Sequence, residues 1–255
     1  MSRSDSPVAA TETPRRQFLG ELAAGAAALA AVACAPAATA ANAPAQAPAP
    51  ANQPPATRMT KPLPPQSSIK WDSSWMDRIS ARHKVVFDSP EIVEGTALYH
   101  AMSYLGSVKD VFGTGDSDAS VVVVLRHRAV PMLYNDDMWK KYDIGTETKT
   151  LDEKTKLAVT RNVYWQNLDK DGNPASDDKP SATIKSLANR GVIFVGCDIA
   201  TRGFSYRLAQ KAKLEQADVY EEIKQNLLGN ATLMPTGIFG MLLAQEKGCS
   251  LLRST

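Results

Sequence analysis

Two short apolar runs constrain the fold of this chain more than any other feature of its sequence. The segment Ser120–Leu125 contains four consecutive valines, and residues 192–195 read Val-Ile-Phe-Val. A strand with one face in water alternates apolar and polar residues, so runs without alternation indicate strands that are buried on both faces. Such strands are typical of a parallel sheet covered by helices on both sides.

The segments around these runs alternate between strand-like and helix-like patterns. Leu98, Met102 and Leu105, for example, recur at helical spacing. We predict strands at 83–87, 120–125, 192–195, 231–234 and 249–253, helices at 69–81, 98–112, 131–142, 181–190, 199–212, 217–228 and 237–247, and a polar excursion at 145–180. The order of these elements predicts a three-layer αβα sandwich with a mostly parallel five-stranded sheet and right-handed crossovers.

The first forty residues have the pattern of an export signal. The segment 13–19, Thr-Pro-Arg-Arg-Gln-Phe-Leu, resembles the twin-arginine export motif, although Pro14 and Gly20 depart from it. An uncharged, Ala-rich run follows at 22–35, which is too short for a bilayer helix but suits a signal peptide. Ala38-Thr39-Ala40 then offers a small-x-small cleavage site. We therefore predict a signal peptide at 1–40 and a periplasmic product.

Cys34 leaves an alternative open, because Ala31-Val32-Ala33-Cys34 looks like a degraded lipobox. If Cys34 is lipidated, the protein is a membrane-tethered lipoprotein. Residues 41–66 are mainly Ala, Pro, Gln and Asn, and proline-rich chain of this kind forms an extended linker rather than a domain. We predict the folded domain at 67–255.

Composition narrows the possible partners. The chain has 29 Lys and Arg residues against 27 Asp and Glu, which gives no reason to expect a nucleic-acid partner. Its histidines are His83, His100 and His127, and no Cys-x-x-Cys occurs, so there is no zinc pattern. We predict no resident metal or cofactor.

Candidate functional residues follow the ends of the predicted strands, because ligands on such sheets bind beyond the carboxyl ends of the strands. These ends carry Asp88, Arg126-His127-Arg128, Gly196-Cys197 and Pro235-Thr236. Cys197 is the most informative, since it opens a predicted helix, and backbone N–H groups there favour a thiolate. Arg126, His127 and Arg202 add positive charge, whereas the adjacent carboxylate of Asp198 opposes it.

The residues around Cys197 also resemble a known family. Residues 197–203 read Cys-Asp-Ile-Ala-Thr-Arg-Gly and follow the strand 192–195, while Met234-Pro235-Thr236-Gly237-Ile238 and Gln245-Glu246-Lys247-Gly248 form a closing segment. Together they resemble the DsrE/DsrF-like proteins, which include the TusD-type sulfur relay subunits. The resemblance covers about 83–253 and implies the three-layer fold, a homotrimer or homohexamer, and a cysteine that carries sulfur as a persulfide, here Cys197.

Some features depart from that family. Asp198 replaces an apolar residue, the segment 131–180 is longer than in small members, and those members act in the cytoplasm beside sulfite reductase or tRNA-thiolation partners. The stretch from Arg126 to Tyr142 looks like that of longer, exported relatives, and it adds Asn135 to Arg126, His127 and Arg202 as candidate substrate-binding residues. The resulting hypothesis is a periplasmic sulfur carrier that accepts sulfane sulfur on Cys197 and passes it to a partner thiol.

Two other functions remain open at this stage. Cys197, His127 and a nearby methionine are soft enough ligands for copper(I). Alternatively, Cys197 is only packed, and the fold is a non-catalytic oligomeric binding module. A disulfide between Cys197 and Cys249 is not expected, since one ends a strand and the other precedes one, which places them at opposite edges of a parallel sheet.

Overall fold

The structure is a computed structural model that describes residues 61–176, 179–228 and 231–255. The predicted signal peptide at 1–40, the possible lipidation site Cys34 and most of the predicted linker 41–66 lie outside these residues.

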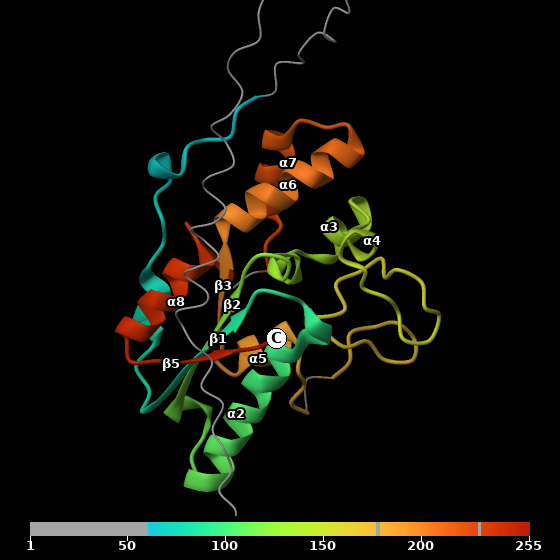
Figure 1. The fold of residues 1–255 in the computed structure, drawn as a ribbon. Helices are drawn as coiled ribbons and strands as arrows, with labels where there is room; N and C mark the ends of the chain where they lie inside the picture. Colours follow the sequence, from blue (N-terminus) through green and yellow to red (C-terminus); the bar gives the residue numbers. More distant parts are fainter. Residues whose placement is uncertain (1–60, 177–178, 229–230) are drawn as a thin grey trace, which may run out of the picture. The chain divides into compact units, whose positions relative to one another are not determined.

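A parallel sheet forms the centre of the described residues (Figure 1). Its strands are β1 (His83–Ser89), β2 (Ala119–Leu125), β3 (Ile193–Cys197), β4 (Ala231–Met234) and β5 (Ser250–Arg253), in the spatial order β4-β3-β2-β1-β5. Every neighbouring pair is parallel, which confirms the predicted three-layer α/β architecture with five strands. The sequence predicted a mostly parallel sheet, and the structure shows that all neighbouring strands of this sheet are parallel.

The two apolar runs occupy the middle of this sheet. β2 and β3 are neighbours, with Val122 opposite Ile193 and Val124 opposite Val195. Alternate residues face two separate cores: Val123 and Phe194 pack on one side, and Val122 and Val195 on the other. Their burial on both faces explains the absence of alternation in the sequence.

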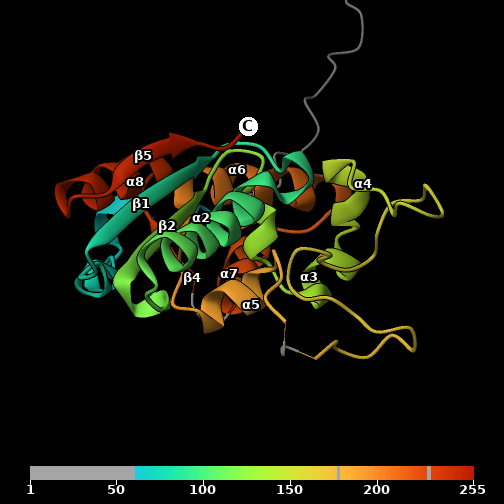
Figure 2. The ribbon, with the colours of Figure 1, turned by 90° about the horizontal axis from the view of Figure 1, so that it is seen from below.

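The direction of the connections decides which helix covers which face. The chain steps in one direction from β1 to β4, and the helices on these crossovers are α2 (Thr96–Phe112), α5 (Ile184–Asn189), α6 (Asp198–Ala212) and α7 (Gln216–Gln225). Because crossovers between parallel strands are right-handed, these helices share one face, and their apolar residues join a single core. The chain then returns from β4 to β5 at the other edge, which places α8 (Gly237–Glu246) on the opposite face (Figure 2).

The segment before β1 shares this second face with α8. Trp75 and Ile79 are buried there with Met241 of α8. The predicted helix at 69–81 is nevertheless wrong. The segment contains a short 3₁₀ helix, η2 (Ser74–Arg78), preceded by the turn η1 (Gln66–Ser68). The Asp72 side chain accepts a hydrogen bond from the backbone N–H of Ser74 at 2.9 Å, a local turn that competes with a regular helix.

The predicted helix at 131–142 is also divided. It consists of the 3₁₀ helix η5 (Val130–Leu133) and the helix α3 (Asp136–Lys141). Asn135 lies between them in an extended conformation, and its side chain accepts a hydrogen bond from the N–H of Met138, so a new helix begins there. A further short helix, α4 (Ile144–Thr148), opens the predicted polar excursion.

Two 3₁₀ helices and one short α-helix complete the description of the fold. The turns η3 (Val93–Gly95) and η4 (Asp116–Asp118) flank α2, and the predicted helix at 181–190 is shortened to α5. Within the described residues, no helix combines the length and apolar character needed to cross a membrane.

Candidate functional site

The topology sends the chain to opposite faces of the sheet after two neighbouring strands. β3 and β4 are neighbours, but β3 continues into α6 on one face and β4 continues into α8 on the other. Ligands on open α/β sheets bind where adjacent strands diverge in this way. The residues at this point are Cys197, the last residue of β3, and Pro235, which follows β4.

Cys197 joins β3 to α6. Its backbone is extended (φ −100°, ψ 114°), and it is the N-cap residue of this 15-residue helix. The hydroxyl of Thr201 donates to its carbonyl oxygen at 3.1 Å, and the hydroxyl of Tyr134 donates to Thr201 at 3.4 Å. The side chain is buried, with 7% of the residue exposed. Cys197 therefore lies at the N-terminus of α6, as the sequence predicted.

Arg126 brings positive charge to this edge. Its guanidinium donates two hydrogen bonds to the carboxylate of Asp88, at 2.7 Å from Nε and 2.9 Å from Nη2. These bonds are the largest cause of the raised pKa of Arg126, and its proximity to Cys197 raises that pKa further. Asp88, Arg126 and Cys197 were predicted to lie at one edge because each follows a strand, and the structure brings them together.

The start of α8 packs closely against Arg126. A Cβ atom added to Gly237 would lie 2.6 Å from the Cβ of Arg126, so only glycine fits at this position without displacing the arginine. The side chain of Thr236 caps the helix by accepting a hydrogen bond from the N–H of Phe239. The N-termini of α6 and α8 thus follow neighbouring strands and lie on opposite faces of the sheet.

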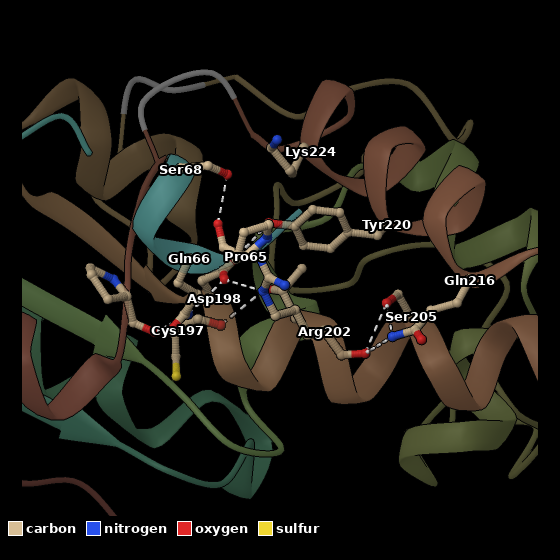
Figure 3. Close-up of polar contacts among 12 residues, drawn as sticks. Pro65, Gln66, Ser68, Cys197, Asp198, Arg202, Ser205, Gln216, Tyr220 and Lys224 are labelled. Carbon is tan, nitrogen blue, oxygen red and sulfur yellow. Dashed lines mark hydrogen bonds and ion pairs between the residues drawn. The ribbon is translucent and has the colours of Figure 1, made fainter. Parts of the chain in front are cut away.

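Asp198 is the centre of a polar cluster that sequence reasoning missed (Figure 3). Its carboxylate is fully buried and accepts hydrogen bonds from Arg202 Nε at 2.5 Å, from the hydroxyl of Tyr220 at 2.5 Å and from Gln66 Nε2 at 2.8 Å. Gln66 also donates to the carbonyl oxygen of Pro235 at 2.9 Å. The predicted opposition between Asp198 and a charged thiol is therefore reduced, because the carboxylate is paired.

Arg202 is the positively charged hydrogen-bond donor in this cluster. Burial is the largest single influence on its pKa and lowers it, but the hydrogen bond and charge attraction to Asp198, together with the effects of Tyr220, leave the pKa above its ordinary value. Burial, followed by the bond to Asp198, raises the pKa of Tyr220. Figure 3 shows the sulfur of Cys197 pointing away from these partners. The cluster thus fixes the first turn of α6 on one side, and the thiol lies on the other.

The remaining predicted site residues have other partners. His127 is 64% exposed at its side chain, and its Nδ1 lies 3.1 Å from a carboxylate oxygen of Glu91. Asn135 caps α3, and its side-chain amide donates to the Asn226 side chain at 2.9 Å. Among the predicted binding residues, Arg126 therefore lies near Cys197, and Arg202 is hydrogen-bonded to the adjacent Asp198.

Two further observations concern the thiols and metal binding. Neither Cys197 nor Cys249 forms a disulfide. Cys197 ends β3 and Cys249 directly precedes β5, and β2 and β1 lie between these two strands. In the part of the chain that the structure describes, no group of three or more His, Cys, Asp and Glu side chains has an arrangement suited to a metal ion.

Comparisons with known proteins give little further information. No protein-family model matches the sequence, and no curated protein matches it. Among solved structures, the chain is similar to a protein of unknown function, MTH1491, from Methanobacterium thermoautotrophicum, with a TM-score of 0.35 and 15% identity. That similarity covers 67% of this chain and 98% of the other.

Proposed function

We propose that this protein is a periplasmic sulfur carrier that holds sulfane sulfur as a persulfide on Cys197. The observation that carries the proposal is the position of this thiol. It lies at the carboxyl edge of the sheet, at the N-terminus of α6, where Arg126 supplies nearby positive charge. Helix N-termini and neighbouring cations favour the thiolate, which is the nucleophilic form of cysteine. The resemblance of residues 197–203 to the DsrE/DsrF-like cysteine motif supports the same role.

The proposed reaction consists of two balanced transfers. The Cys197 thiolate attacks the outer sulfur of a persulfide, polysulfide or thiosulfate donor; the new S–S bond forms as the donor's S–S bond breaks, and the donor leaves as a thiolate, shorter polysulfide or sulfite. An acceptor thiolate then attacks the outer sulfur of the Cys197 persulfide and regenerates the Cys197 thiolate. Neither step needs an external oxidant, because each one exchanges one S–S bond for another.

The surrounding residues have separate roles in this proposal. Arg126 attracts an anionic donor, although its pairing with Asp88 leaves only part of its charge for that purpose. Arg202 keeps the neighbouring Asp198 carboxylate paired. The twin-arginine segment of the sequence supports export, and the partner thiol would then belong to another exported protein. Assembly as a homotrimer or homohexamer remains a prediction from the family resemblance.

Intact-mass spectrometry of the protein from Ala41 onward tests this proposal. After incubation with polysulfide or thiosulfate, we expect a gain of about 32 Da per transferred sulfur atom, located on Cys197 by peptide mapping. The Cys197→Ser variant should show no gain. Cys249→Ser is the matched control, because it removes the other buried thiol and should retain the adduct.

Two outcomes would contradict the proposal. One is an adduct that persists in Cys197→Ser. The other is a Cys197 that reacts neither with sulfur donors nor with small alkylating reagents, which would leave a packed thiol in a binding module.

A further inference from the structure

A cavity lies among residues that the sulfur chemistry proposed above does not use. It has a volume of about 660 Å³ and is lined by the segments that follow β1 and β2 together with residues of α4 and α6. Cys197 is not among its lining residues. The volume lies within the range of small-molecule sites, roughly 300 to 1,000 Å³.

The backbone around this cavity is strained. Val93, Glu94 and His127 have φ values of 37°, 54° and 50°, in the left-handed region that residues other than glycine rarely adopt. For a β-branched residue such as Val93 this conformation is especially unfavourable. Val93 and His127 both line the cavity. Strain of this kind persists where the surrounding structure enforces it, and it is concentrated at ligand sites.

The two strained loops are held together by backbone hydrogen bonds. The N–H groups of Arg128 and Ala129 donate to the carbonyl oxygen of Pro90, at 2.9 and 3.3 Å. The N–H of Arg126 donates to Ser89 at 3.0 Å. One wall of the cavity is consequently fixed before any ligand arrives.

Charged side chains on the cavity walls form matched pairs. On the loop side, Glu91 lies 3.5 Å from Arg128 Nε and also contacts His127. On the helix side, Arg207 Nε donates to Glu147 at 2.9 Å. Both arginine side chains are about half exposed, at 57% for Arg128 and 49% for Arg207. Exposed ion pairs of this type are weak, so a ligand can exchange with either partner.

Between these pairs the cavity has an apolar surface. Ile92, Val93 and Phe204 line it, and the guanidinium of Arg207 lies 4.9 Å from the centre of the Phe204 ring. Phe204 is almost completely buried and belongs to the main core, so it forms a rigid floor.

From this arrangement we propose that the cavity binds a small zwitterion, either an amino acid or a short peptide with free termini and an apolar side chain. The cavity walls carry two guanidinium groups and two carboxylates, which pair with each other. A simple anion would pair with an arginine and leave a glutamate without its partner, and a simple cation would do the reverse. A zwitterion replaces both, since its carboxylate pairs with an arginine and its ammonium with a glutamate. The apolar side chain packs against Ile92 and Val93, which line the same cavity. This site is independent of the sulfur chemistry proposed for Cys197.

Isothermal titration calorimetry of the protein from Ala41 onward tests the site with four probes: L-leucine, Ala-Leu, Ala-Leu-Ala, and Ala-Leu-Ala with an acetylated N-terminus and an amidated C-terminus. We expect saturable binding of at least one zwitterionic probe and none of the blocked peptide. Arg207→Gln and Glu91→Gln should each weaken that binding about tenfold or more, since each removes one charged partner of the ligand.

Lys211→Gln is the matched control. Lys211 lies on the same helix as Arg207 and forms an exposed ion pair with Asp143, but it does not line the cavity. Binding should be unchanged in this variant and in Cys197→Ser, and circular dichroism should confirm that all variants are folded. The inference is overturned if no zwitterionic probe binds at millimolar concentration, if the blocked peptide binds equally well, or if both charge variants bind normally.

Discussion

The two buried thiols of this protein are alike in exposure and different in setting. Cys197 and Cys249 expose 7% and 5% of their surfaces. Cys249 precedes β5, at the amino edge of the sheet, and burial raises its pKa, with only a partial opposing effect from Lys84. Cys197 ends β3 at the carboxyl edge, where α6 begins and Arg126 lies nearby. The position of a cysteine relative to the strand is therefore more informative than its burial.

The reason for this difference lies in the parallel sheet. All strands point the same way, so helix N-termini and the side chains that follow each strand gather at one edge. The opposite edge receives helix C-termini, whose partial charge disfavours a thiolate. Three experiments test the contrast between the thiols, beginning with the largest expected effect.

The first prediction concerns the polar cluster around Asp198, the residue next to Cys197. No such cluster lies beside Cys249 in the contacts described above. Asp198→Ala should lower the free energy of unfolding by about 3 to 5 kcal/mol, because it leaves the largely buried Arg202 without its carboxylate. The hydroxyl of Tyr220 loses its acceptor in the same variant. Urea denaturation measures the change.

Lys211→Ala is a suitable comparison for this variant, since it breaks an exposed ion pair with Asp143 from a position inside α6. Exposed pairs contribute roughly 0 to 1 kcal/mol, so this variant should remain close to the parent protein. Equal effects of the two substitutions would show that the Asp198 cluster does not stabilise the fold.

The second prediction addresses reactivity. Arg126→Met removes positive charge near Cys197 and leaves the Asp88 carboxylate unpaired, so alkylation of Cys197 by iodoacetamide should slow by about tenfold. Alkylation of Cys249 should not change. Mass spectrometry of the labelled peptides distinguishes the two thiols.

A double variant separates the two charges in this experiment. Asp88→Asn combined with Arg126→Met should recover part of the rate, because the unpaired carboxylate is gone. Arg128→Met, which affects an exposed arginine paired with Glu91, should leave the rate at Cys197 unchanged. A normal rate in Arg126→Met would exclude this arginine as an activating group.

The third and smallest effect is a pH dependence at Cys249. Burial raises the pKa of its thiol, so the unfolded chain loses this proton at a lower pH than the folded chain does. The stability that the neutral thiol contributes is present below the unfolded pKa and is lost as the pH rises through the higher folded pKa. Cys249→Ala should therefore flatten the fall in stability on the alkaline side, as measured by thermal unfolding between neutral and alkaline pH. A curve as steep as that of the parent protein would assign the fall to other groups.

The sequence predicted the sheet well because burial on both faces leaves a local signature. The runs at 120–125 and 192–195 became the neighbouring strands β2 and β3, with boundaries close to those expected. The helix at 69–81 failed because spacing alone does not distinguish a regular helix from a 3₁₀ turn that buries the same residues, Trp75 and Ile79.

The candidate site was predicted only in part, for a related reason. Cys197 and Arg126 follow strands, and the order of the strands placed them at one edge. Arg202 stands four residues after Asp198, a helical spacing that could have indicated their ion pair. The other partners of Asp198 left no such signal, since Gln66 is 132 positions away and Tyr220 is on another helix.

The order of the strands also has a consequence for how the chain is synthesised. β5 pairs with β1, although residues 250–253 and 83–89 are separated by nearly the whole domain. During translation, the edge of β1 that pairs with β5 therefore stays unpaired until β5 has left the ribosome. Contacts between such distant segments form slowly, and exposed edges can pair with other chains in the meantime. A chain that stops before residue 250 would keep that edge permanently, so its main risk is aggregation rather than the loss of a few local contacts.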